Sequence, residues 1–112
     1  MPLYLVQFNY APRAFQALMD QPNVDHAAEA SAMVGSLGGK LHGYWYAFGQ
    51  FDGVVLLEAP DNSTIAAVAV AIGASGEVTR LETTVLLTMD DARTATGKLA
   101  GATHLPQTAR ST

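Results

Sequence analysis

The residues best suited to chemistry lie on two neighbouring predicted strands. His42, Tyr44 and Tyr46 alternate along the first strand, and Asp52 and Glu58 lie six residues apart along the second. Side chains two residues apart in a strand point to the same face of a sheet, so these five side chains are expected to share one face. In such a cluster, His42 or Asp52 is the candidate catalytic proton acceptor, and the tyrosines would orient an aromatic or carbonyl substrate.

The same periodicity adds three polar residues from the two other predicted strands. Gln7, Asn9 and Arg80 fall on the face that carries His42. The candidate ligand-binding residues are therefore Gln7, Asn9, His42, Tyr44, Tyr46, Asp52, Glu58 and Arg80. An interface between two copies explains the same residues, with Arg80 paired to Asp52, Glu58 or Glu82. Both interpretations remain open from the sequence.

Other kinds of site find little support. His26, His42 and His104 lie in separate segments with no close-spaced pair, so we expect no metal site. Gly38 and Gly39 end a predicted helix, whereas a phosphate-binding loop begins one. The serines lack the spacing of a nucleophile elbow. No cofactor is predicted.

The composition limits the class of protein. With 112 residues, of which 49% are hydrophobic, the chain can fill one core, and a single domain is expected. A net charge of −4 and only six Lys and Arg residues argue against a nucleic-acid partner, because such binding depends on clustered basic residues. The chain has no cysteine, which excludes disulfides and thiolate sites.

No segment indicates export or a membrane partner. Met1-Pro2-Leu3-Tyr4 lacks the basic and long apolar regions of a secretory signal. The most apolar stretch, Ile65 to Ile72, is far shorter than the roughly 20 residues that span a bilayer. We therefore expect a cytoplasmic protein.

Periodicity, glycine and proline divide the chain into alternating strands and helices. Apolar alternation predicts strands, helical spacing predicts helices, and Gly and Pro mark their ends. The expected elements are a strand over 3–10, a short helix ending before Pro22, a longer helix from about Asn23 to Gly38-Gly39, strands over 40–48 and 51–59 joined by a tight turn at Gly49-Gln50, a buried helix over 61–73 and a strand over 78–87. Gly49 is expected to supply a positive φ in that turn.

This order predicts an α+β, ferredoxin-like βαββαβ fold, with a four-stranded antiparallel sheet and two helices on one face. The domain is expected to cover residues 1–99. Residues 100–112 contain few large apolar side chains and are expected to form a mobile tail.

The other face of the sheet would then carry no helix. Besides the polar residues above, it is predicted to expose Leu3, Leu5, Val54, Leu56 and Leu86, while Trp45 is assigned to the core. So much apolar surface favours burial against another copy, as a homodimer or higher homo-oligomer. Two facing sheets would enclose a partly polar cavity.

Several motifs resemble the GYD domain family of small bacterial proteins. They are Gly49-Gln50-Phe51-Asp52, the run from Val54 to Asp61, Leu37-Gly38-Gly39-Lys40 and Arg80-Leu81-Glu82-Thr83. The resemblance covers residues 1–99 and implies a ferredoxin-like fold with a dimeric α/β-barrel type of assembly. The family usually has Gly-x-Tyr-Asp where this chain has Phe51, so a role of that tyrosine hydroxyl does not carry over. The family has no settled activity.

Two functions follow as hypotheses. The first is a small oligomeric module that binds a small organic ligand between two sheets, or that serves assembly only. The alternative is a cofactor-independent enzyme, similar to a monooxygenase or isomerase, acting on an aromatic or polyketide-like substrate. This alternative rests on fold analogy, and the sequence does not decide whether the protein is an enzyme.

Overall fold

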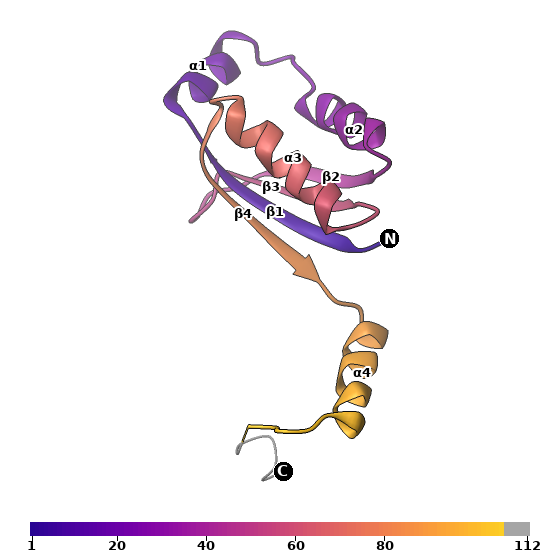
Figure 1. Cartoon of the computed structure of the whole chain (residues 1–112). Helices are drawn as coiled ribbons and strands as arrows, with labels where there is room; N and C mark the ends of the chain where they lie inside the picture. Colours follow the sequence, from indigo (N-terminus) through magenta and orange to yellow (C-terminus); the bar gives the residue numbers. More distant parts are fainter. Residues whose placement is uncertain (107–112) are drawn as a thin grey trace.

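The computed structural model describes residues 1–106 and contains one four-stranded sheet with three helices on one side (Figure 1). Its elements are β1 (Leu3–Tyr10), α1 (Pro12–Asp20), α2 (His26–Ser36), β2 (Lys40–Tyr46), β3 (Gly53–Glu58), α3 (Asn62–Ala74), β4 (Val78–Leu86), α4 (Met89–Gly97) and a 3₁₀ turn (Lys98–Gly101). The short helix, the break near Pro22 and the longer helix match the prediction.

The sheet has the strand order β2-β3-β1-β4, and its neighbouring strands are antiparallel. Together with two helical crossovers, this order is the ferredoxin-like arrangement, so the predicted fold class is confirmed. α2 packs over β2, and α3 packs beside β4 on the same face of the sheet. The predicted domain boundary after Leu99 and the mobility of residues 100–112 stay predictions, and residues 107–112 lie outside the described part.

Alternation along β1 and β3 separates the two faces of the sheet. Tyr4, Val6 and Phe8 are at most 4% exposed, and they pack with Val55 and Leu57 under the helices. The opposite face, called the open face below, carries Leu3, Leu5, Gln7, Asn9, His42, Trp45, Val54, Leu56, Glu58, Arg80, Glu82, Thr84 and Leu86. The parity predicted for β1, β3 and β4 is therefore correct.

The parity predicted for β2 fails after His42. Leu41 pairs with Leu57, but Gly43 pairs with Leu56, so β2 contains one extra residue, a β-bulge. The bulge exchanges the faces of all the residues that follow it. Tyr44 and Tyr46 lie on the helix-covered side and not on the open face, as their pairing with Val55 and Gly53 shows. Trp45, predicted to be core, lies on the open face and is 52% exposed.

Three further expectations need correction. β2 and β3 are joined by the segment from Ala47 to Asp52, and not by a two-residue turn. Among residues 1–106 the glycines with positive φ are Gly38 and Gly76, so Gly49 does not have the predicted conformation. The helix predicted to be buried, α3, exposes much of its outer surface, with Val70 71% exposed, because only one side of it faces the sheet.

Helix ends follow local signals. Asp25 and Asp61 accept hydrogen bonds from the backbone N–H groups of Ala28 and Thr64, which caps α2 and α3. Gly38, with φ +84°, ends α2 in the left-handed conformation, at the helix end that was predicted there. In the described residues, no helix is long and apolar enough to cross a membrane.

Candidate functional site

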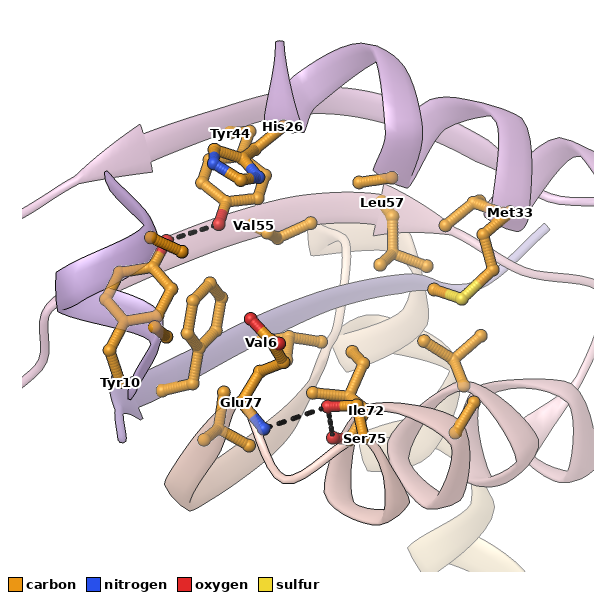
Figure 2. A pocket seen from close by; sticks show the side chains of 18 of the residues that line it. Val6, Tyr10, His26, Met33, Tyr44, Val55, Leu57, Ile72, Ser75 and Glu77 are labelled. Atoms are coloured by element: carbon orange, nitrogen blue, oxygen red, sulfur yellow. Dashed lines mark hydrogen bonds between the residues drawn. The ribbon is translucent and has the colours of Figure 1, made fainter. Parts of the chain in front are cut away.

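A cavity of about 260 Å³ lies between the sheet and the helices α1, α2 and α3 (Figure 2). Most of its lining is aliphatic or aromatic, and the polar exceptions are Tyr10, Tyr44, His26, Ser75 and Glu77. A mostly apolar hollow with a few polar groups is the usual form of a small-molecule site. This cavity is therefore the candidate functional site.

Small side chains on the helices leave this space empty. Ala14 and Ala17 of α1, Ala30 of α2 and Ala71 of α3 all border the cavity. A methyl group reaches a much shorter distance than a leucine side chain, so helices at normal spacing from the sheet do not fill the volume between them. The alanines thus determine where the cavity lies.

Two tyrosine hydroxyls meet at one end of the cavity. Tyr10 is the last residue of β1, and Tyr44 lies in β2 after the bulge. Their hydroxyls share a short hydrogen bond (Figure 2). Phe8 supports both rings through edge-to-face contacts, with centroid distances of 5.3 and 5.9 Å. The bulge is what brings Tyr44 to Tyr10.

Burial keeps this pair protonated. It raises the pKa of Tyr10 well above the ordinary value, and the hydrogen bond from Tyr44 adds to the effect. Burial also raises the pKa of Tyr44, although its hydrogen bond with Tyr10 acts in the opposite direction. At neutral pH both hydroxyls are hydrogen-bond donors, so they suit a ligand carbonyl or hydroxyl oxygen and do not suit the role of general base.

The histidine of the cavity comes from the first turn of α2. The His26 side chain is 30% exposed, and its Nδ1 lies 3.8 Å from Glu29 Oε2. That distance is too long for a hydrogen bond, so the imidazole keeps its capacity to bind elsewhere. His26 is thus a polar group that borders the cavity without a close partner among the described residues.

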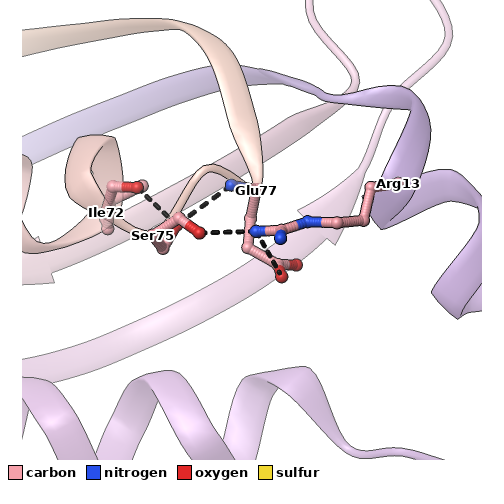
Figure 3. A network of polar contacts seen from close by, with 4 residues as sticks. All are labelled: Arg13, Ile72, Ser75 and Glu77. Carbon is pink, nitrogen blue, oxygen red and sulfur yellow. Dashed lines mark hydrogen bonds and ion pairs between the residues drawn. The ribbon is translucent and has the colours of Figure 1, made fainter.

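A polar network ties α1 to the connection between α3 and β4 beside the cavity (Figure 3). The Arg13 guanidinium donates to the Ser75 carbonyl oxygen over 2.7 Å and lies 3.7 Å from Glu77 Oε1. The Ser75 hydroxyl donates to the Ile72 carbonyl oxygen and accepts from the Glu77 N–H. These contacts hold two walls of the cavity together.

A family model described as the GYD domain matches residues 4–96. The chain belongs to the GYD domain family. The sequence has no significant match among curated proteins. The resemblance noted from the sequence motifs is therefore confirmed.

Two solved structures share the fold of this GYD domain. FFRP-DM1 superposes with a TM-score of 0.51 at 11% identity, over 78% of this chain and 100% of that one. MtbAldR gives a TM-score of 0.50 at 11% identity over 78% of this chain, which spans about half (52%) of its length. At such low identity the likeness supports the fold alone.

The eight predicted ligand residues do not form one cluster in the GYD domain. Tyr44 and Tyr46 lie on the helix-covered side, and of these two only Tyr44 borders the cavity. On the open face, the His42 Nε2 atom lies 3.0 Å from Glu58 Oε2, and Arg80 pairs with Glu82 over 3.1 Å. Of the three carboxylates considered as partners of Arg80, Glu82 is the one that it contacts. Its guanidinium also lies 4.8 Å from the centre of the Phe51 ring.

The two candidate proton acceptors lie at opposite ends of the sheet. Glu58, the partner of His42, pairs with Leu3 at the start of β1, whereas Asp52 bonds to Asn9 and Tyr10 at its end. Six residues of strand separate these ends by about 20 Å. His42 and Asp52 therefore do not act on one ligand atom within a single chain.

Asp52, in the GYD-like motif, has a structural role. Its Oδ2 accepts from the Tyr10 backbone N–H at 3.0 Å and from Asn9 Nδ2 at 3.2 Å, and Asn9 also donates to the Gln50 carbonyl oxygen at 3.1 Å. The motif thereby fixes the end of β1, from which the Tyr10 side chain enters the cavity. Within residues 1–106, no group of three metal-binding side chains is found.

Sequence reasoning missed Tyr10 and His26 as site residues. Tyr10 follows the alternation of β1 onto the helix-covered face, where its ring borders the cavity. The signal that could have corrected Tyr44 is Gly43, because a glycine inside a strand often marks a bulge. A Cβ at residue 43 would meet the outer end of the Trp45 ring, so the ring in its present position packs over Gly43.

Proposed function

We propose that this GYD-domain protein binds one small, mostly apolar organic molecule in the cavity between its sheet and its helices. The observation that carries the proposal is the 260 Å³ apolar space with two protonated tyrosine hydroxyls at one end. The hypothesis of a small-molecule ligand is retained from the sequence. The proposed ligand site is now on the helix-covered face of the sheet, where Tyr44 lies, and not on the open face.

The volume favours a molecule of one or two rings. An apolar cavity of about 150 Å³ takes up benzene, and sites for drug-sized ligands begin at about 300 Å³. The lining contains no lysine or arginine that would bind an anion. Because one hydroxyl of the Tyr10–Tyr44 pair donates to the other, one O–H remains to donate a hydrogen bond to a ligand oxygen. An aromatic phenol or ketone is therefore the expected class.

The test compares 2-naphthol with naphthalene as probes, titrated calorimetrically into the full chain. In the double variant Tyr10→Phe/Tyr44→Phe, which has neither hydroxyl, 2-naphthol should bind up to about tenfold more weakly, because one hydrogen bond contributes about 0.5–1.5 kcal/mol. The affinity for naphthalene should change less than about twofold, since that probe has no oxygen.

Tyr46→Phe is the matched control, because Tyr46 neighbours Tyr44 but does not line the cavity. This variant should bind both probes like the parent. If neither probe binds, or if Tyr46→Phe loses as much affinity for 2-naphthol as the double variant, the proposal is wrong.

A second candidate is cofactor-independent catalysis on an aromatic substrate, of the monooxygenase or isomerase type. The Tyr10–Tyr44 pair favours it, because the hydroxyl proton left free by the pair would stabilise negative charge that develops on a substrate oxygen. Mass spectrometry of 2-naphthol after incubation with the protein in air tests this candidate. A protein-dependent change in mass favours oxygenation, and a new chromatographic peak of unchanged mass favours isomerisation. A probe unchanged in both mass and retention time favours binding alone. The absence of cysteine fits the reducing cytoplasm, which we propose as the location.

A further inference from the structure

His26 is the polar side chain of the cavity that remains free to accept a proton. The tyrosine pair is protonated at neutral pH and donates hydrogen bonds. The Ser75 hydroxyl already has a partner on each side, and Glu77 Oε1 faces the Arg13 guanidinium at 3.7 Å. The His26 ring has no close partner within residues 1–106. The imidazole is therefore the available proton acceptor in the lining.

His26 lies at the end of the cavity where Tyr44 enters (Figure 2). It is the first residue of α2, and α2 packs over β2, the strand that carries Tyr44. Burial raises the pKa of Tyr44, and the negative charge of Glu29 adds to the increase. The same carboxylate lies 3.8 Å from His26 Nδ1. A proton acceptor and a hydroxyl donor thus occupy one part of the cavity.

Glu29 determines which imidazole nitrogen can act. A carboxylate beside Nδ1 favours the tautomer that has its proton on that nitrogen, and Nε2 then carries the lone pair. At 3.8 Å the two groups are too far apart for a hydrogen bond but close enough for an ion pair. Glu29 therefore stabilises the imidazolium formed by a proton transfer more than the neutral ring.

The free O–H of the Tyr10–Tyr44 pair suits a substrate oxygen that gains negative charge. One hydroxyl donates to the other, which leaves a single proton for the ligand. Edge-to-face contacts with Phe8 hold both rings, so the donor is fixed before a ligand arrives. A fixed donor in an apolar site is the usual means of stabilising an oxyanion.

We infer that the cavity enolises a ketone, with His26 as the catalytic base and the free tyrosine O–H as the oxyanion donor. The C–H bond next to the carbonyl group breaks, and its proton moves to His26 Nε2. The electron pair of that bond forms a carbon–carbon double bond, while the π pair of the carbonyl moves to the oxygen, which accepts the tyrosine hydrogen bond. Return of a proton to carbon completes the cycle, and no oxidant or reductant is consumed. The inference rests on the proposed binding of an aromatic ketone in this cavity.

The partial exposure of His26 connects the reaction with solvent. Its side chain is 30% exposed, so the imidazolium can exchange its proton with water while the ketone stays in the cavity. In D₂O the atom returned to carbon is then a deuteron. Each enolisation therefore leaves a label on the ketone.

The test measures deuterium incorporation into 2-tetralone, a two-ring ketone of the size proposed for the cavity. The full chain is incubated with the ketone in D₂O at about pH 8, above the ordinary titration range of histidine. NMR follows the loss of the proton signals next to the carbonyl, and the rate without protein is subtracted. His26→Gln should lower the rate at saturating ketone by about 100-fold or more, because a general base contributes about 10²–10⁴-fold. The KM of this variant should change less than about twofold, since the imidazole acts mainly after binding.

Two further variants test the other groups of the site. Tyr10→Phe/Tyr44→Phe should lower the saturated rate by about 100-fold, because the oxyanion loses its donor. Glu29→Gln should lower it only about two- to fivefold, because water weakens the effect of an exposed charge. His104→Gln is the matched control: this histidine is exposed and lies outside the cavity lining, so its variant should exchange at the parental rate.

Calorimetry with the same proteins separates this inference from the binding proposal. Naphthalene should bind His26→Gln within about twofold of the parent, which would show that the cavity is intact. If the parent binds 2-tetralone but exchanges its protons no faster than His26→Gln does, the enolisation is wrong and the binding proposal stands. The enolisation is also wrong if the parent binds 2-naphthol and not the ketone. If none of the three probes binds, both proposals fail.

Discussion

Replacing Ala30 by leucine tests whether the cavity is truly empty. Ala30 borders the cavity from α2, and leucine adds three carbon atoms. Each buried carbon contributes about 0.8 kcal/mol, so full burial would stabilise the fold by up to about 2.4 kcal/mol. Loss of leucine side-chain freedom removes about 0.5–1 kcal/mol. The expected gain in the free energy of unfolding is therefore about 1–2 kcal/mol.

Thermal unfolding followed by circular dichroism measures the effect. A gain of this size should raise the Tm by about 4–16 °C for a domain near 100 residues. The direction of the Tm change distinguishes an empty cavity from a filled core, because a larger side chain in a filled core would destabilise the fold by about 1–3 kcal/mol. A lower Tm for Ala30→Leu would refute the empty cavity.

The control is Ala32→Leu, on the exposed side of the same helix and outside the cavity lining. Its free energy of unfolding should stay within about 0.5 kcal/mol of that of the parent. Ala30→Leu should also abolish binding of 2-naphthol, since leucine occupies the space of the ligand. Retained binding in a stabilised variant would mean that the probe binds elsewhere.

Two further predictions concern the end of β1. Asp52→Ala should lower the free energy of unfolding, measured by urea titration, by about 1–3 kcal/mol, because the Tyr10 N–H loses its acceptor. Asp52→Asn keeps an oxygen at this position and should lose less stability. Equal losses in the two variants would argue that Asp52 does not stabilise the end of β1 through this hydrogen bond. Burial raises the pKa of Tyr10, so above pH 10 the native state retains a proton that the unfolded state loses. The free energy of unfolding should therefore be independent of this group below pH 10 and should fall as the pH rises above 10. In Tyr10→Phe that alkaline slope, up to about 1.4 kcal/mol per pH unit, should be shallower, and an unchanged slope would contradict the assignment.

Local patterns along the chain predicted the fold and most of the sheet. In β1 and β3 the alternation from Tyr4 to Phe8 and from Val55 to Leu57 assigned the faces correctly, because continuous strand pairing makes side-chain direction depend only on position in the chain. The caps at Asp61 and Gly38 are local as well, since they depend on hydrogen bonds and φ angles within a few residues. The family membership followed from motifs of the same kind.

The site depends on how elements far apart in the chain pack together. One extra residue at His42 reversed the faces of Tyr44 and Trp45. This reversal depends on how β2 pairs with β3, and the conformational preferences of the residues in β2 alone do not determine that pairing. The cavity depends on the distance between three helices and the sheet, and alanines such as Ala30 and Ala71 look the same in a filled core as beside an empty space. Because a volume belongs to several elements at once, no segment of the sequence encodes it alone.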